Sequence, residues 1–161
     1  GLKLPAHTFY VDNLVAFVPL PHVKRMRYVD VNLYRYYIGR QDQSVNEQEM
    51  ISRADQQLKI NRMMIDCMAE TKNLHKNTRS YMLHMLTMIM TVSSVILLRS
   101  GTQENLKKKQ ELWKYLKTAD GKDYFSIRHS LLGRAMNLPG RGGRRLSVTA
   151  YKIVQRIYGF N

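Results

Sequence analysis

An acidic residue follows an aromatic run near the start of the sequence. Asp12 comes directly after Phe9, Tyr10 and Val11, a run typical of extended chain, and precedes a short helix expected to begin at Asn13 or Leu14. A carboxylate in that position can face a cleft and take part in chemistry there. It can also cap the helix, because aspartate oxygens accept hydrogen bonds from the first free backbone amides. The residue types leave both roles open.

A second polar segment contains a single arginine between two expected elements. Arg40 lies in a loop between a strand ending at Ile38 and a helix expected to begin at Ser44. Guanidinium groups and the amides at a helix amino terminus both bind phosphate oxygens. The alternative is a solvated turn in which Arg40 pairs with Asp42.

A glycine- and arginine-rich segment, residues 138–145, lies close to the end of the sequence. It lacks the Gly-Lys-Ser or Gly-Lys-Thr ending and the preceding strand of a nucleotide-binding loop. Its composition predicts a flexible basic connector that meets RNA, lipid head groups or water.

Residues 147–158 follow this segment with the apolar spacing of a helix that has one basic side. Such a helix binds an anionic surface or docks on its own protein. The candidate anion- and membrane-binding residues are Arg141, Arg144, Arg145, Lys152 and Arg156.

The sequence shows no residue pattern for a disulfide, a zinc site or a catalytic nucleophile. The single Cys67 excludes an intrachain disulfide and the usual clustered zinc site. No Gly-x-Ser-x-Gly or Cys-His arrangement offers a nucleophile. The histidines lack the short spacing of a metal site, and we expect no metal ligands in this chain; they are His7, His22, His75, His84 and His129.

The elements that must position these residues are mainly helical. Two short strands are predicted, at Arg25–Val29 and Leu33–Ile38, from their Val and Tyr content. From Ser44 onward the apolar period changes to that of a helix, with Glu47 placed to form a capping box with Ser44. Further helices are expected at 103–117, 122–136 and 147–158, with breaks at Gly101, Gly121 and residues 138–143.

Charge and hydropathy are unevenly distributed along the 161 residues. The net charge is +14, and fourteen basic but only four acidic residues lie between Arg99 and Arg156. This balance implies an anionic partner. Residues 80–98 carry no formal charge and are long enough for a membrane span, but their Ser, Thr, His and Met content favours a buried core helix.

The order of these segments resembles the later half of bacterial family 2 glycosyltransferases of the exopolysaccharide type. The resemblance rests on Gly1–Pro5, Tyr10–Asn13 and Tyr34–Ser44, and continues through Leu112–Leu116 and Arg134–Asn161. It implies a mainly α fold with a small β remnant: the carboxy-terminal part of a GT-A type α/β glycosyltransferase followed by a helical bundle. Residues 1–43 would end the catalytic domain, and residues 44–161 would form the helical domain with its basic tail.

The resemblance also implies roles for particular residues. Asp12 matches the acid of the family's Glu-Asp motif, although Val11 stands where Glu is frequent, and would remove a proton from the acceptor hydroxyl. Arg40 and Ser44 match a loop near the donor diphosphate. The family's Asp-x-Asp metal motif is present only in weakened form at Asp30–Asn32.

The resemblance therefore implies a carboxy-terminal fragment that is inactive alone and holds no cofactor. The parent enzyme would use a nucleotide-sugar donor with Mg or Mn and a lipid-linked glycan acceptor. We expect a cytoplasmic location, peripheral at the inner face of the membrane. The alternatives are a basic helical nucleic-acid-binding module, for which the high charge is the main support, and a structural domain built around residues 80–98.

Overall fold

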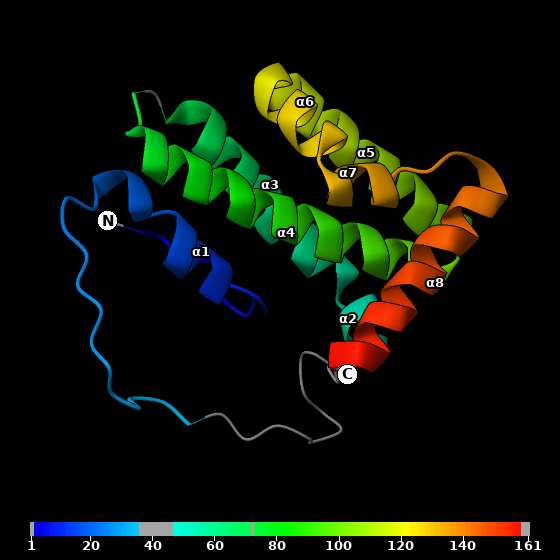
Figure 1. Ribbon diagram of the computed structural model, residues 1–161, viewed down its shortest axis with the longest axis horizontal. Coiled ribbons are helices and arrows are strands. Elements are labelled where there is room, and N and C mark those ends of the chain that lie inside the picture. Colours follow the sequence, from blue (N-terminus) through cyan, green and yellow to red (C-terminus); the bar gives the residue numbers. More distant parts are fainter. Residues whose placement is uncertain (1, 36–46, 72, 159–161) are drawn as a thin grey trace.

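The chain forms a bundle of helices around one long central helix, α4. Figure 1 shows the computed structural model, which describes residues 2–35, 47–71 and 73–158. Its elements are α1 (Asp12–Phe17), the 3-10 helix η1 (Leu20–His22), α2 (Glu47–Ser52), α3 (Ala54–Glu70), α4 (Lys76–Ser100), α5 (Gln103–Ala119), α6 (Gly121–His129), α7 (Leu131–Met136) and α8 (Gly140–Tyr158). No strand occurs in these described ranges, so the mainly α fold class is confirmed.

Apolar faces of α3 and α4 build most of the core. The predicted stripe along α3 is buried, including Leu58, Met64 and Met68. It meets Met82 and Met90 of α4, which are fully buried. Unbranched methionine side chains fill irregular gaps well, so these helices pack closely without a strict repeat.

A polar seam also joins the central helices. Asn61 of α3 donates from Nδ2 to the Ser93 hydroxyl of α4 at 3.0 Å. Trp113 of α5 donates from Nε1 to the neighbouring Ser94 hydroxyl, also at 3.0 Å. Both serines are essentially unexposed, so these bonds satisfy groups that would otherwise be buried without partners.

By length and hydropathy α4 is the one described helix that could cross a membrane, and just over half of its most apolar window is buried in the protein. The predicted burial of residues 80–98 holds for the face carrying Met82, Met90 and Ser93. The opposite side is exposed at Tyr81 and Met88.

The predicted strands are wrong where the structure describes them. Residues 25–35 form neither a helix nor a ladder, and backbone hydrogen bonds from Val31 to Val29 and from Leu33 to Val31 close short turns. Tyr28 and Leu33 are 85% and 87% exposed. Residues 36–38 of the second strand lie outside the described residues. Val and Tyr favour extended backbone, but a strand also needs a partner strand, and no described segment supplies one.

Helix boundaries agree with the sequence in part. The helix expected at 103–117 is α5, with Thr102 accepting a hydrogen bond from the Asn105 amide at 3.2 Å. The helix expected at 122–136 is divided into α6 and α7 at Ser130, whose side chain caps α7. The expected start at Ser44 lies outside the described residues, and α2 and α3 are separated at Arg53.

The break expected at residues 138–143 is wrong in its second half, because α8 begins at Gly140. Gly140 has φ of +69°, a left-handed conformation that glycine adopts without strain. Gly143 lies so close to Leu138 that a Cβ atom would come within 2.7 Å of its carbonyl carbon. The glycines therefore form a tight entry into a helix rather than a flexible connector.

Candidate functional site

Asp12 lies in the first turn of α1 with an exposed side chain. The N-cap position is Val11, and no side chain caps this helix. Asp12 therefore does not cap α1 by a side-chain hydrogen bond. The carboxylate still lies at the positive end of the helix, where the backbone dipoles favour negative charge.

The turn before Asp12 has unusual backbone geometry. Tyr10 has φ of +68°, which is rare for a bulky side chain. Its carbonyl oxygen accepts hydrogen bonds from the backbone amide and the side-chain Nδ2 of Asn13, each at 3.1 Å. Such strain persists only where surrounding contacts impose it, and it clusters at functional sites.

Those contacts come from the junction of α2 and α3. The Phe9 amide donates to Oε1 of Gln56 at 2.7 Å, and the Arg53 guanidinium lies 3.8 Å from the centre of the Phe9 ring. Arg53 is itself held by Glu49 at 2.7 Å. The same surroundings act on Tyr10: burial raises the pKa of its hydroxyl, and the Arg53 charge opposes that rise. Residues 9–12 are thus fixed on the helical bundle.

No local sequence pattern predicts this attachment. Arg53 and Gln56 are ordinary polar residues in a helical pattern, and Phe9 is 44 positions before Arg53. Their contacts depend on where the chain returns, which local residue types do not determine.

An open hollow lies beside α1 and not at Asp12. It is an open cavity of about 490 Å³ between the start of the chain, α1, η1 and α3. Its polar lining includes His22, Asp66, Cys67 and Glu70, and Leu14 forms part of its apolar wall. Burial raises the pKa of the Cys67 thiol, so the surroundings do not favour a thiolate.

The two candidate phosphate ligands, Arg40 and Ser44, lie outside the described residues. The structure therefore says nothing of their distance from Asp12. Asp30, in the weakened metal motif, is exposed and accepts a hydrogen bond from the Tyr28 hydroxyl at 3.3 Å. Among the described residues no three His, Cys, Asp or Glu side chains come together to hold a metal ion. The described part of the chain does not fit the divalent metal that the resemblance implies for the parent enzyme.

All five basic candidates of the tail lie on α8. Arg141, Arg145, Lys152 and Arg156 are exposed, whereas Arg144 is half-buried. The structure thus places them together on one helix. Arg141, Arg144 and Arg145 line an open groove of about 460 Å³ between α8 and the turn that joins α4 to α5.

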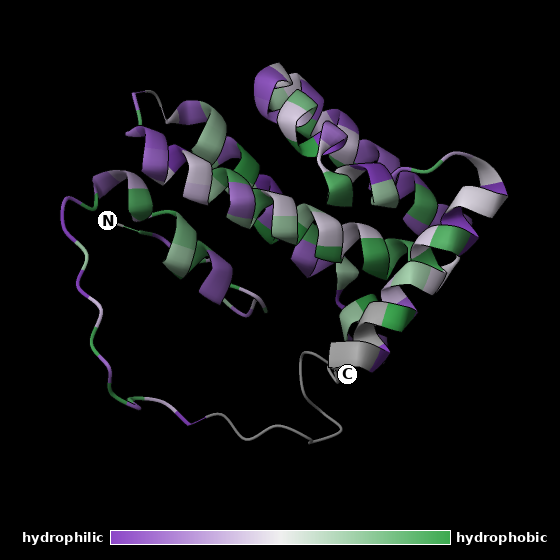
Figure 2. Cartoon of the chain, viewed as in Figure 1, coloured by the Kyte–Doolittle hydropathy of each residue, from purple (hydrophilic) through white to green (hydrophobic). Residues whose placement is uncertain are grey.

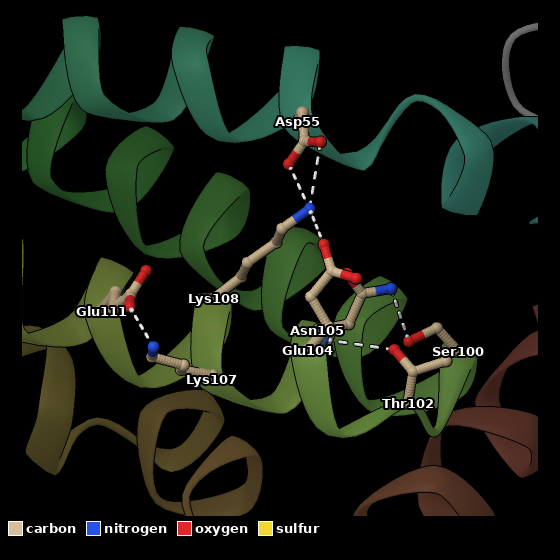
Figure 3. A network of polar contacts seen from close by, with 8 residues as sticks. All are labelled: Asp55, Ser100, Thr102, Glu104, Asn105, Lys107, Lys108 and Glu111. Carbon is tan, nitrogen blue, oxygen red and sulfur yellow. Dashed lines mark hydrogen bonds and ion pairs between the residues drawn. The ribbon is translucent and has the colours of Figure 1, made fainter.

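The turn between α4 and α5 is held by a polar network (Figure 3). Asn105 donates from Nδ2 to the Ser100 hydroxyl at 2.8 Å, and its backbone amide donates to the hydroxyl of the N-cap residue Thr102 at 3.2 Å. Lys108 reaches Asp55 of α3 at 2.7 Å and Glu104 within α5 at 3.0 Å. These bonds fix one wall of the groove.

Lys109 is a buried charged residue that was not among the candidates predicted from the sequence. Lys109 lies on the inner face of α5, and its Nζ donates to Oδ1 of Asn137 at 2.8 Å. Burial, helped by the charge of Arg128, lowers the pKa of Lys109 to about 8. A signal was available, because Lys109 has the helical spacing of the buried Leu112, Trp113 and Leu116.

Comparisons with known proteins add no relative to this picture. No family model matches the chain, and no curated protein or solved structure matches it.

Proposed function

We propose that the chain is the acceptor-side and carboxy-terminal portion of an inverting glycosyltransferase. The enzyme would move a sugar from a nucleotide-sugar donor to a growing, lipid-linked polysaccharide. The observation that carries the proposal is the Asp12 carboxylate, which is exposed at the end of a strained turn that Phe9 fixes on the bundle. The resemblance of the surrounding segments to family 2 enzymes supports the same assignment.

In this proposal Asp12 accepts the proton of the acceptor hydroxyl as that oxygen attacks the sugar's anomeric carbon. A fixed carboxylate suits this role, because a general base must lie within hydrogen-bonding reach of the proton it removes. The contacts of Phe9 with Arg53 and Gln56 would hold Asp12 in position. Arg40 and Ser44 would stabilise the departing diphosphate, as positive charge and hydroxyl groups do for phosphate oxygens.

The donor nucleotide and its divalent metal would be held by residues outside this chain. The chain alone would therefore be inactive, and its membrane-linked substrate would place the enzyme at the inner face of the cell membrane. A basic nucleic-acid-binding module is the alternative, and RNA binding at physiological salt without binding to anionic vesicles would favour it.

The test is the Asp12→Asn substitution in the complete transferase, with release of nucleoside diphosphate as the readout. We expect turnover to fall by about a hundredfold or more with nearly unchanged donor affinity, because an amide cannot accept the proton. Arg40→Ala should weaken both donor binding and turnover. The matched control is Glu111→Gln, which removes an exposed carboxylate of α5 that has no role in the proposal.

The melting temperature of Asp12→Asn should fall only slightly, because Asp12 provides no capping hydrogen bond and only its interaction with the helix dipole is lost. Normal turnover in Asp12→Asn would refute its role as the base. A fall in turnover accompanied by a large fall in the melting temperature would instead assign Asp12 to the stability of α1.

A further inference from the structure

The last described helix, α8, presents two different exposed surfaces. Arg141, Arg145, Lys152 and Arg156 are four, seven and four residues apart, so they lie within about 60° of the helix circumference. We call these four residues the basic stripe. Leu146 and Ile153 are seven residues apart, about two turns, and therefore lie on one line beside it. They are 61% and 55% exposed, and we call them the apolar pair.

A third side of α8 anchors the helix to the bundle. The Ser147 hydroxyl donates to the Ala135 carbonyl of α7, and it is only 2% exposed. Val148 and Tyr151 pack against the cluster formed by Leu98 and Met136. Because Ser147, Val148 and Tyr151 make these contacts, α8 docks on the protein without the basic stripe or the apolar pair.

The position of α8 leaves its outer sides accessible. Figure 1 shows the helix at one edge of the molecule, across the end of α4. Figure 2 shows hydrophobic and hydrophilic positions alternating along it. Isolated exposed apolar residues are common, but here two large ones share a line next to four cations.

The charges of the basic stripe are not neutralised within the described protein. None of the four residues forms an ion pair with a described carboxylate. Glu47, whose charge acts on Tyr151 of α8, is already bound by Arg99 through two nitrogen atoms at 2.8 and 2.5 Å. An external anion would compensate the field of the basic stripe.

We propose that α8 binds the surface of an anionic lipid bilayer, lying in the plane of the head groups. The basic stripe contacts lipid phosphates, and the apolar pair enters the boundary between head groups and acyl chains. A helix with adjacent basic and apolar sides has the arrangement that this environment requires. The groove lined by Arg141, Arg144 and Arg145 offers one phosphate three guanidinium groups. A polyanion such as RNA would use the cations but has no use for Leu146 and Ile153.

Binding of this chain to vesicles tests the proposal. Vesicles of phosphatidylcholine are compared with vesicles that also contain phosphatidylglycerol, at low and high salt. We expect binding to the anionic vesicles only, and a residual fraction at 0.5 M salt because apolar contacts are not screened. The proposed membrane binding does not depend on the glycosyltransferase assignment, because the vesicle experiment measures binding and not sugar transfer.

Two double variants separate the contributions. Arg145→Gln with Lys152→Gln should weaken binding at low salt by about tenfold or more, from the loss of two cations near the surface. Leu146→Gln with Ile153→Gln should abolish the fraction that remains at high salt. All four positions are exposed, so circular dichroism and the melting temperature should not change.

Matched controls use exposed residues on other helices. Lys107→Gln with Lys114→Gln removes two cations of α5, and Phe125→Gln with Leu131→Gln removes two large apolar groups from α6 and α7. Both controls should bind like the unmodified chain. Equal loss in the controls, or unchanged binding in the apolar double variant, would overturn the proposal. So would binding of an RNA oligonucleotide at physiological salt by a chain that ignores anionic vesicles.

Discussion

Trp113 and Ser94 join α5 to α4 by a hydrogen bond inside the core, 3.0 Å from the indole Nε1 to the hydroxyl oxygen. The same hydroxyl donates to the Met90 carbonyl at 2.7 Å, so Ser94 is both acceptor and donor. Neither residue is more than 6% exposed, and water cannot easily replace either partner. This pair explains why a serine suits this buried position of α4.

Replacing Ser94 with Ala should lower the free energy of unfolding by about 1–3 kcal/mol, because the buried indole N–H loses its acceptor. Urea denaturation measures the change. In a Trp113→Phe background the same substitution should cost clearly less, since no donor is left unpaired. Equal costs in the two backgrounds would show that the hydrogen bond is not the origin of the effect.

Arg79 compensates a buried carboxylate, and its loss should destabilise the protein in a pH-dependent way. Asp123 is 2% exposed and meets Nη2 of Arg79 at 2.5 Å, while its Oδ2 atom has no described partner. Burial raises the pKa of Asp123, although the Arg79 charge lowers it. We expect Arg79→Met to cost about 2–4 kcal/mol at pH 7, where an unpaired charge would remain buried.

The cost of Arg79→Met should shrink as the pH falls toward the raised pKa of Asp123. Below that pKa the folded state takes up a proton that the unfolded state does not yet bind, which favours folding. Urea denaturation at pH 7 and pH 5 compares the two states. Lys107→Met is the control, because its pair with Glu111 is exposed and long, at 3.9 Å. A cost independent of pH would mean that Arg79 acts through packing alone.

Lys109 should destabilise the folded state at neutral pH. Its pKa is lowered to about 8 from 10.5, so between these values the unfolded chain binds a proton that the folded protein has released. Stability of the unmodified protein should therefore rise with pH through this window. Lys109→Met should be more stable at pH 7, by about 1–2 kcal/mol after the loss of the bond to Asn137, with an advantage that vanishes at about pH 9 and reverses above it.

Denaturation at pH 7 and pH 9.5 distinguishes this effect from general packing. Lys108→Met is the matched control on the same helix. Its hydrogen bonds with Asp55 and Glu104 raise the pKa of Lys108, so its replacement should not stabilise the protein. A Lys109→Met variant less stable than the unmodified protein at pH 7 would show that the bond to Asn137 outweighs the burial of the charge.

Two adjacent glycines in α8 should respond oppositely to the same substitution. A Cβ on Gly143 would lie 2.7 Å from atoms of Leu138, so Gly143→Ala should cost about 1–3 kcal/mol. A Cβ on Gly142 meets nothing within 4 Å, and Gly142→Ala should be neutral or stabilising by up to about 1 kcal/mol. Thermal melting of the two variants checks this, and equal effects would contradict the close approach at Gly143.

Local pattern predicts the helices of this protein well and its turns less well. The helix expected at 103–117 is α5, because the breaks expected at Gly101 and Gly121 lie directly beside its ends. The flexible break predicted at Gly140 and Gly143 is wrong. Glycine occurs both in loops and in tight helix entries, and only the position of Leu138 decides between them. The strand predicted at Arg25–Val29 failed because strand formation depends on a partner that the local residues do not specify.

The candidate site was predictable only in its individual residues. The aromatic run before Asp12 marked the segment, but nothing local indicated that Arg53 would stack on Phe9. The basic residues of α8 were identified by type, whereas their separation from the anchoring side containing Ser147 follows from packing against α7.

Oxidation of the methionines between α3 and α4 would report on the separation of these two helices. Met64, Met68, Met82 and Met90 are at most 1% exposed, whereas Met26 is 76% exposed. We therefore expect peroxide to oxidise Met26 first and to reach the four core sulfur atoms only while the two helices are apart. A sulfoxide is larger and more polar than the thioether, so each oxidation in this contact should favour the separated helices and expose the next methionine to the same reaction.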